Sequence, residues 1–78
     1  MRKLKLIWDF RGPVSKNTAE HHLIHLREFI QIEKYDIEIT GVETLSEMHS
    51  IAYLVVDEKD MKVIRDRLKP HRGQVWNQ

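Results

Sequence analysis

The sequence contains no cysteine, and only three glycines and two prolines occur in its 78 residues. The absence of cysteine excludes disulfide bonds, thiolate catalysis and cysteine-ligated zinc or iron–sulfur centres, and it favours a reducing compartment, so we expect the cytoplasm. No repeat, linker or low-complexity segment divides the chain. These features predict a single domain over residues 1–78.

The chain also lacks an excess of one charge and any long apolar run. Thirteen Lys and Arg residues face twelve Asp and Glu residues, for a formal net charge of +1, so we expect no nucleic-acid partner. The start of the chain alternates between polar and apolar residues and lacks the apolar core of a secretory signal, so neither secretion nor membrane insertion is expected.

Four segments have the pattern of β-strands. Residues 3–10 alternate almost perfectly and put Leu4, Leu6, Trp8 and Phe10 on one face, which predicts a strand with one buried face. Residues 36–44 and 49–56 resemble further strands, and Gly41 is a candidate bulge in the first of them. Residues 74–76 suffice for a short last strand.

Two segments between these strands have helical periodicity. Apolar residues at positions 19, 23, 26 and 30 form a stripe that continues to about Tyr35, and Asn17 and Glu20 are a candidate capping pair for its start. Asp57 is the expected N-cap of a second helix, with Met61, Ile64 and Leu68 on its apolar side, and Pro70 should end it.

The expected order is therefore β-α-β-β-α-β. With right-handed crossovers this order predicts an α+β protein with a ferredoxin-like split βαβ sandwich, in which two helices cover one face of a four-stranded antiparallel sheet. The same face of each strand should bury its apolar residues, which leaves the other face of the sheet open.

Histidine is abundant, with five residues. In the expected topology four histidines and two arginines come to one end of the sheet, where three connections meet. This end is the candidate ligand-binding site. Its expected members are Asp9, Arg11, Gly12, His21, His22, His49, His71 and Arg72.

Three kinds of chemistry would suit this end of the molecule. His21 and His25 have the i, i+4 spacing of a divalent-metal site, to which Glu28 would add a carboxylate and His49 or His71 a loop ligand. A helix N-terminus beside an arginine would hold a small anionic ligand. A histidine near the helix start would serve as a general base in a small enzyme.

The layout resembles that of ACT-type domains, which are small ferredoxin-like modules that bind amino acids or other small ligands and pair through sheets or helices. The strand end and turn Asp9-Phe10-Arg11-Gly12 and the segment from Ile51 to Leu68 carry the resemblance, although residues 13–18 lengthen the loop. The resemblance implies that Asp9 and Gly12 belong to a ligand loop.

We therefore expect a non-catalytic small-ligand-binding or protein-interaction module without a required cofactor, and a metal-binding protein or a small enzyme as alternatives. A domain of this size buries little surface, so we expect a homodimer. Ile24 and Ile32 lie off the apolar stripe of their helix and are candidates for the dimer interface, as is the open sheet face around Ile7.

Overall fold

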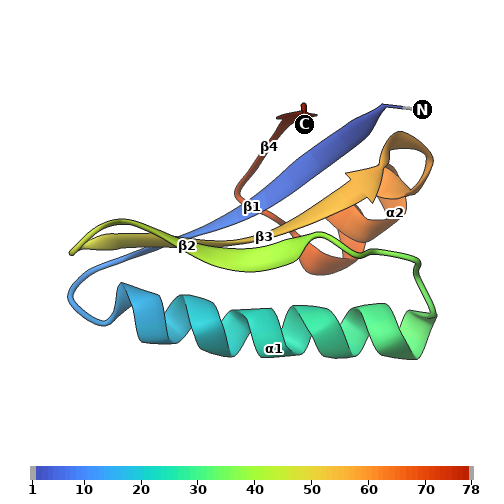
Figure 1. Cartoon of the computed structure of the whole chain (residues 1–78). Coiled ribbons are helices and arrows are strands. Elements are labelled where there is room, and N and C mark those ends of the chain that lie inside the picture. Colours follow the sequence, from blue (N-terminus) through green and yellow to red (C-terminus); the bar gives the residue numbers. More distant parts are fainter. Residues whose placement is uncertain (1, 78) are drawn as a thin grey trace.

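The computed structural model describes residues 2–77 and contains six helices and strands in the predicted order. Strand β1 is followed by the long helix α1, a hairpin of β2 and β3, the shorter helix α2 and a last strand β4 (Figure 1). Their bounds are β1 Lys3–Arg11, α1 Ser15–Glu33, β2 Thr40–Ser46, β3 His49–Asp57, α2 Glu58–Leu68 and β4 Arg72–Trp76.

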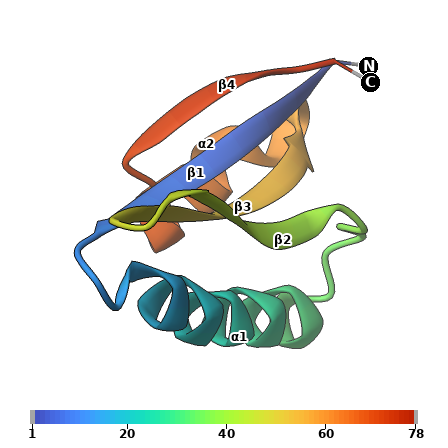
Figure 2. The same cartoon turned by 60° about the vertical axis from the view of Figure 1, so that its left-hand side comes forward.

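The four strands form one antiparallel sheet in the order β2-β3-β1-β4 (Figure 2). The register pairs Leu6 with Leu54 and Arg11 with His49 along β1 and β3, whereas β4 pairs only with the first half of β1, from Lys3 to Ile7. This architecture confirms the α+β class and the β-α-β-β-α-β order, and it is consistent with a ferredoxin-like fold.

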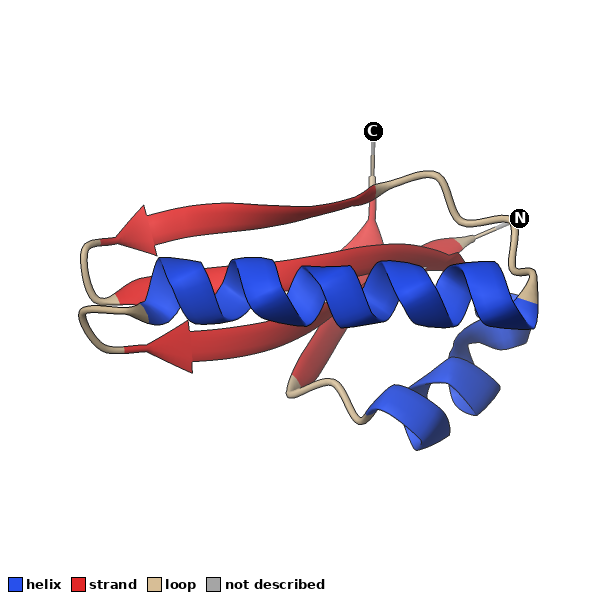
Figure 3. Ribbon diagram, turned by 90° about the horizontal axis from the view of Figure 1, so that it is seen from below, coloured by secondary structure: helices blue, strands red, loops and turns tan. Residues whose placement is uncertain are grey.

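Both helices cover the same face of the sheet (Figure 3). The alternation of β1 and β3 directs their apolar residues to this face, where they meet one apolar stripe from each helix. The resulting core consists of Leu6, Trp8, Leu23, Leu26, Ala52, Leu54, Val56 and Ile64. No helix within residues 2–77 is long and apolar enough to cross a membrane.

The opposite face of the sheet is less open than the alternation suggested. Ile7 is only 1% exposed, and Ile51 and Val55 are also buried. The Nζ atom of Lys5 lies 4.5 Å from the ring centre of Tyr53, which shows how long side chains lie across this face. The expectation that Ile7 lies on an open face is therefore wrong, because that side chain is already buried within one chain.

Three local predictions need correction. Helix α1 begins at Ser15 without a side-chain cap, so Asn17 and Glu20 lie inside it; the turn from Gly12 to Ser15, closed by a 3.1 Å main-chain hydrogen bond, starts the helix earlier. Strand β2 begins at Thr40 rather than at residue 36, because residues 36–39 are used to return from α1 to the sheet.

The bulge also lies elsewhere. The register of β2 shifts between Thr44 and Ser46, not at Gly41. Gly41 instead makes room for the ring of Tyr53, since a Cβ atom at this position would lie 2.7 Å from the tyrosine hydroxyl.

Candidate functional site

Asp9 connects three strands at the end of the sheet where the histidines were expected. Its Oδ1 atom accepts a hydrogen bond from His49 Nε2 on β3 at 2.7 Å. Arg72 on β4 donates from Nε to Oδ2 at 2.9 Å and from Nη2 to Oδ1 at 3.1 Å. These contacts form because the register brings His49 and Arg72 to the same face of the sheet as Asp9, one on each side of it.

The Asp9 carboxylate is strongly stabilised in its charged form. The hydrogen bond from Arg72 has the largest effect and, together with the bond from His49, lowers the pKa of Asp9 to about 2 against the opposing effect of burial. The same hydrogen bond raises the pKa of the Arg72 guanidinium above its ordinary value. Both carboxylate oxygens are therefore occupied by donors of this chain.

His71 continues the pairing of β4 with β1 through its side chain. Its main-chain N–H donates to the carbonyl of Ile7 at 2.9 Å, and its ring Nδ1 accepts the main-chain N–H of Asp9 at 2.8 Å. An imidazole nitrogen accepts a hydrogen bond only when it carries no proton, so this contact holds Nδ1 unprotonated. The imidazole ring of His71 thus accepts the β1 hydrogen bond that a main-chain carbonyl of the neighbouring strand would accept in a regular sheet.

His22 lies on the helix side of the sheet, between two aromatic side chains. Its ring centre is 5.3 Å from that of Trp8 and 5.4 Å from that of Phe10, and Phe10 in turn lies 6.4 Å from His71. Burial, followed by the charges of His25, His71 and His21, lowers the pKa of His22. Its Nε2 atom is buried and has no hydrogen-bond partner among residues 2–77.

The structure thus joins part of the expected ligand site. Asp9, His49, His71 and Arg72 are in direct contact, and Phe10 connects them to His22. Gly12 adopts a φ of +110° that favours glycine, and its N–H donates to the carbonyl of Met48 at 2.8 Å. Arg11 is exposed at the end of β1, opposite His49.

The candidate metal ligands lie apart from this cluster, on the solvent side of α1. The Nε2 atoms of His21 and His25 are 3.2 Å apart, and Nδ1 of His25 lies 3.2 Å from a carboxylate oxygen of Glu28. Glu28 therefore contacts the far side of the His25 ring rather than the nitrogen that faces His21. Residues 2–77 contain no group of three or more His, Cys, Asp or Glu side chains placed to hold a metal ion.

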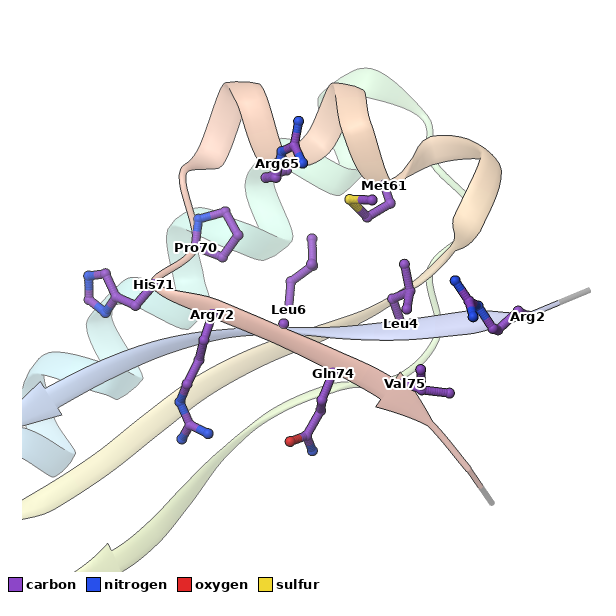
Figure 4. Close-up of a pocket in the computed structure, with 11 residues that line it drawn as sticks. Arg2, Leu4, Leu6, Met61, Arg65, Pro70, His71, Arg72, Gln74 and Val75 are labelled. Atoms are coloured by element: carbon purple, nitrogen blue, oxygen red, sulfur yellow. The ribbon is translucent and has the colours of Figure 1, made fainter.

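A second feature was not predicted from the sequence. An open groove of about 490 Å³ runs between α2 and β4, and this volume lies within the range of small-molecule sites (Figure 4). Leu4, Leu6 and Met61 point into it, and Val75 lies along its edge. The groove exists because α2 packs against β1 and β3, while β4 packs against β1.

The polar side chains that line this groove are cationic or neutral, and none is a carboxylate. Arg2 and Arg65 line it together with Arg72, whose side chain leaves the opposite side of β4 toward Asp9. Arg2 pairs with Glu58 next to the groove, and Arg65 makes a 3.4 Å contact with Asp66. Sequence periodicity could not reveal this site, because the spacing of α2 from β4 has no local signature in the sequence.

Comparisons of the chain with protein-family models, with curated proteins and with solved structures find no significant match.

Proposed function

We propose that this protein is a non-catalytic binding domain whose ligand is a small molecule with an apolar body and one acidic group. The groove between α2 and β4 carries this proposal. Its apolar walls suit a hydrocarbon or aromatic body, and two arginines at its edges suit a carboxylate or a similar anion. An ACT-type role, in which a ferredoxin-like domain senses a small carboxylate, agrees with this chemistry.

The Asp9 cluster has a structural role in this proposal. A general acid or base needs a nitrogen or oxygen that is free to meet a substrate. Asp9 already accepts three hydrogen bonds from His49 and Arg72, and Nδ1 of His71 is used by the main chain. These contacts hold β4 in place and so fix one wall of the groove.

An NMR titration with octanoate tests the ligand chemistry, and octylammonium, with the same chain and the opposite charge, is the matched control ligand. Octanoate should shift the amide signals of α2 and β4, and the Arg65→Gln variant should bind it about tenfold more weakly. Lys62→Gln removes the same charge from α2 outside the groove and should leave binding unchanged. Equal binding of octylammonium, or shifts confined to other parts of the chain, would refute the proposal.

The protein also acts as a homodimer in this proposal. Three of its most exposed large apolar side chains, Val14, Ile24 and Ile32, belong to α1 or precede it directly, and they are 62%, 56% and 73% exposed. Apolar residues gathered on one helix face support an interaction surface. Light scattering after size-exclusion chromatography at high micromolar concentration tests this; a single monomer peak under all conditions would rule the dimer out.

A further inference from the structure

We infer that His21 and His25 bind a divalent transition metal ion, such as Zn²⁺, together with the same two histidines of a second copy of the chain. This inference deepens the proposed dimer by naming the contact that holds it, and it is independent of the ligand groove.

The first argument is the position of the two imidazoles. Two ligands of a tetrahedral zinc ion, each at about 2.0–2.1 Å, lie about 3.3 Å apart. The Nε2 atoms of His21 and His25 are 3.2 Å apart on the exposed side of α1. The pair therefore already has the separation that an ion would require.

The second argument is the contact of Glu28 with Nδ1 of His25, at 3.2 Å. A carboxylate at Nδ1 fixes the proton on that nitrogen and leaves Nε2 free to bind a metal, as is usual for zinc-bound histidines. Glu28 is thus a positioning residue. Metal binding requires the Nε2 atoms of both rings to be free of a proton, so that each imidazole carries its proton on Nδ1.

The third argument is that one chain is incomplete. Residues 2–77 offer two nitrogens at this place but no third ligand, and zinc sites in proteins need three or four protein ligands. The outer side of α1 faces away from the sheet and is covered by no other part of the described chain (Figure 3). A second copy can approach it and supply the two missing imidazoles.

The fourth argument is the spacing of the apolar residues around the pair. His21 and His25 lie two residues on either side of Leu23, and Val14 and Ile32 lie nine residues on either side of it. Seven residues are about two helical turns, so all four side chains lie on one side of α1. Two antiparallel helices related by a twofold axis at the level of Leu23 would put Val14 of one copy against Ile32 of the other, with four imidazoles in the centre.

The test is the mass and zinc content of the untagged protein with ZnCl₂ and with EDTA, measured by light scattering and calorimetry. We expect the mass to double with zinc at one ion per two chains, and Co²⁺ to give the intense visible bands of tetrahedral coordination. His21→Gln and His25→Gln should each abolish the zinc response, whereas His49→Gln, which removes a histidine from β3, should retain it. Ile32→Asp should keep the fold and weaken the zinc-bound dimer at least tenfold.

The outcomes separate the two proposals. A dimer that is equally stable in EDTA and takes up no zinc would support the dimer and overturn the metal site. A monomer in both conditions would overturn both. Zinc binding at one ion per chain without a change of mass would overturn the bridged site.

Discussion

At the scale of single residues, hydrogen bonds between distant segments determine the state of the polar groups. Asp9 is the clearest case, because its carboxylate joins β1 to both neighbouring strands. Its side chain is 16% exposed, whereas that of Arg72 is 48% exposed, so solvent screens part of their interaction.

Replacing this carboxylate should have a pH-dependent effect on stability. A pKa of about 2 instead of 3.8 corresponds to about 2 kcal/mol, which screening at Arg72 reduces to about 1–2 kcal/mol. Asp9→Asn should lose this amount at pH 7. Because the unfolded carboxyl takes up its proton near pH 4 and the folded one near pH 2, the difference from the native protein should be complete above about pH 5, shrink between pH 5 and pH 2, and vanish below about pH 2.

Urea unfolding at several pH values measures this effect. Asp66→Asn is the control, since its carboxylate is exposed on α2, and it should change stability little at any pH. A cost of Asp9→Asn that stays constant between pH 5 and pH 2 would contradict the assigned role of the ion pair.

Two glycines in the sheet offer a second residue-scale comparison. A Cβ atom at Gly41 would lie 2.7 Å from the Tyr53 hydroxyl, whereas one at Gly73 would have its nearest contact at 3.5 Å, which is ordinary van der Waals distance. Gly41→Ala should therefore cost at least about 1 kcal/mol, while Gly73→Ala should be neutral or slightly stabilising. Thermal unfolding of both variants measures the difference, and equal midpoints would show that Tyr53 moves aside freely.

At the scale of helices and strands, local periodicity predicted the buried positions of each element correctly, whereas it did not predict where α1 and β2 begin. The core positions on β1 and α1, including Leu6, Trp8, Leu23 and Leu26, were predicted correctly because burial repeats with the period of each element. The starts of α1 and β2 were wrong because main-chain contacts outside these segments decide them, such as the bond between Gly12 and Met48.

Both helices end on a lysine with left-handed backbone, at Lys34 with φ 58° and at Lys69 with φ 50°. Residues other than glycine pay a steric cost in this conformation. Lys34→Gly should therefore raise the free energy of unfolding by about 0.5–1 kcal/mol, as measured by urea unfolding. Lys62→Gly, inside α2, is the control and should lower it by about 1 kcal/mol; destabilisation by both would show that the lysine side chain matters more than its backbone.

At the scale of the whole molecule, the strands of the sheet differ in how many neighbours hold them. Strands β1 and β3 each have a strand on both sides and carry most of the core, whereas β4 pairs with β1 over five residues and has one free edge. The groove thus lies beside an edge strand that pairs with β1 over only five residues.

Hydrogen exchange should reveal this difference. Amides of β4 that pair with β1 should exchange through local opening, faster than those of β3 from Ile51 to Val56, which should require global unfolding. Octanoate should slow exchange in β4 if it binds in the groove. Equal protection of β3 and β4 would show that the last strand unfolds only with the rest of the domain.

The candidate site could be predicted only in part. Topology alone indicated that His49, His71 and Arg72 come to one end of the sheet, since the direction of each strand follows from the order of the elements. Which of them meet depends on register, and register places Arg72 against Ile7 and His49 against Arg11, so that both reach Asp9. His21 and His25 share a helix, and their closeness was visible from spacing alone.

The sequence by itself determined the order of the strands and helices and the core positions of β1 and of the two helices, because both follow from the repeat of apolar and polar side chains within short segments. Only the tertiary structure decided the pairing of Asp9 and the groove between α2 and β4. The pairing of Asp9 with Arg72 depends on how segments about sixty residues apart are aligned, and the groove depends on how α2 and β4 each pack against β1. Both are set by packing across the whole molecule and leave no local pattern in the chain.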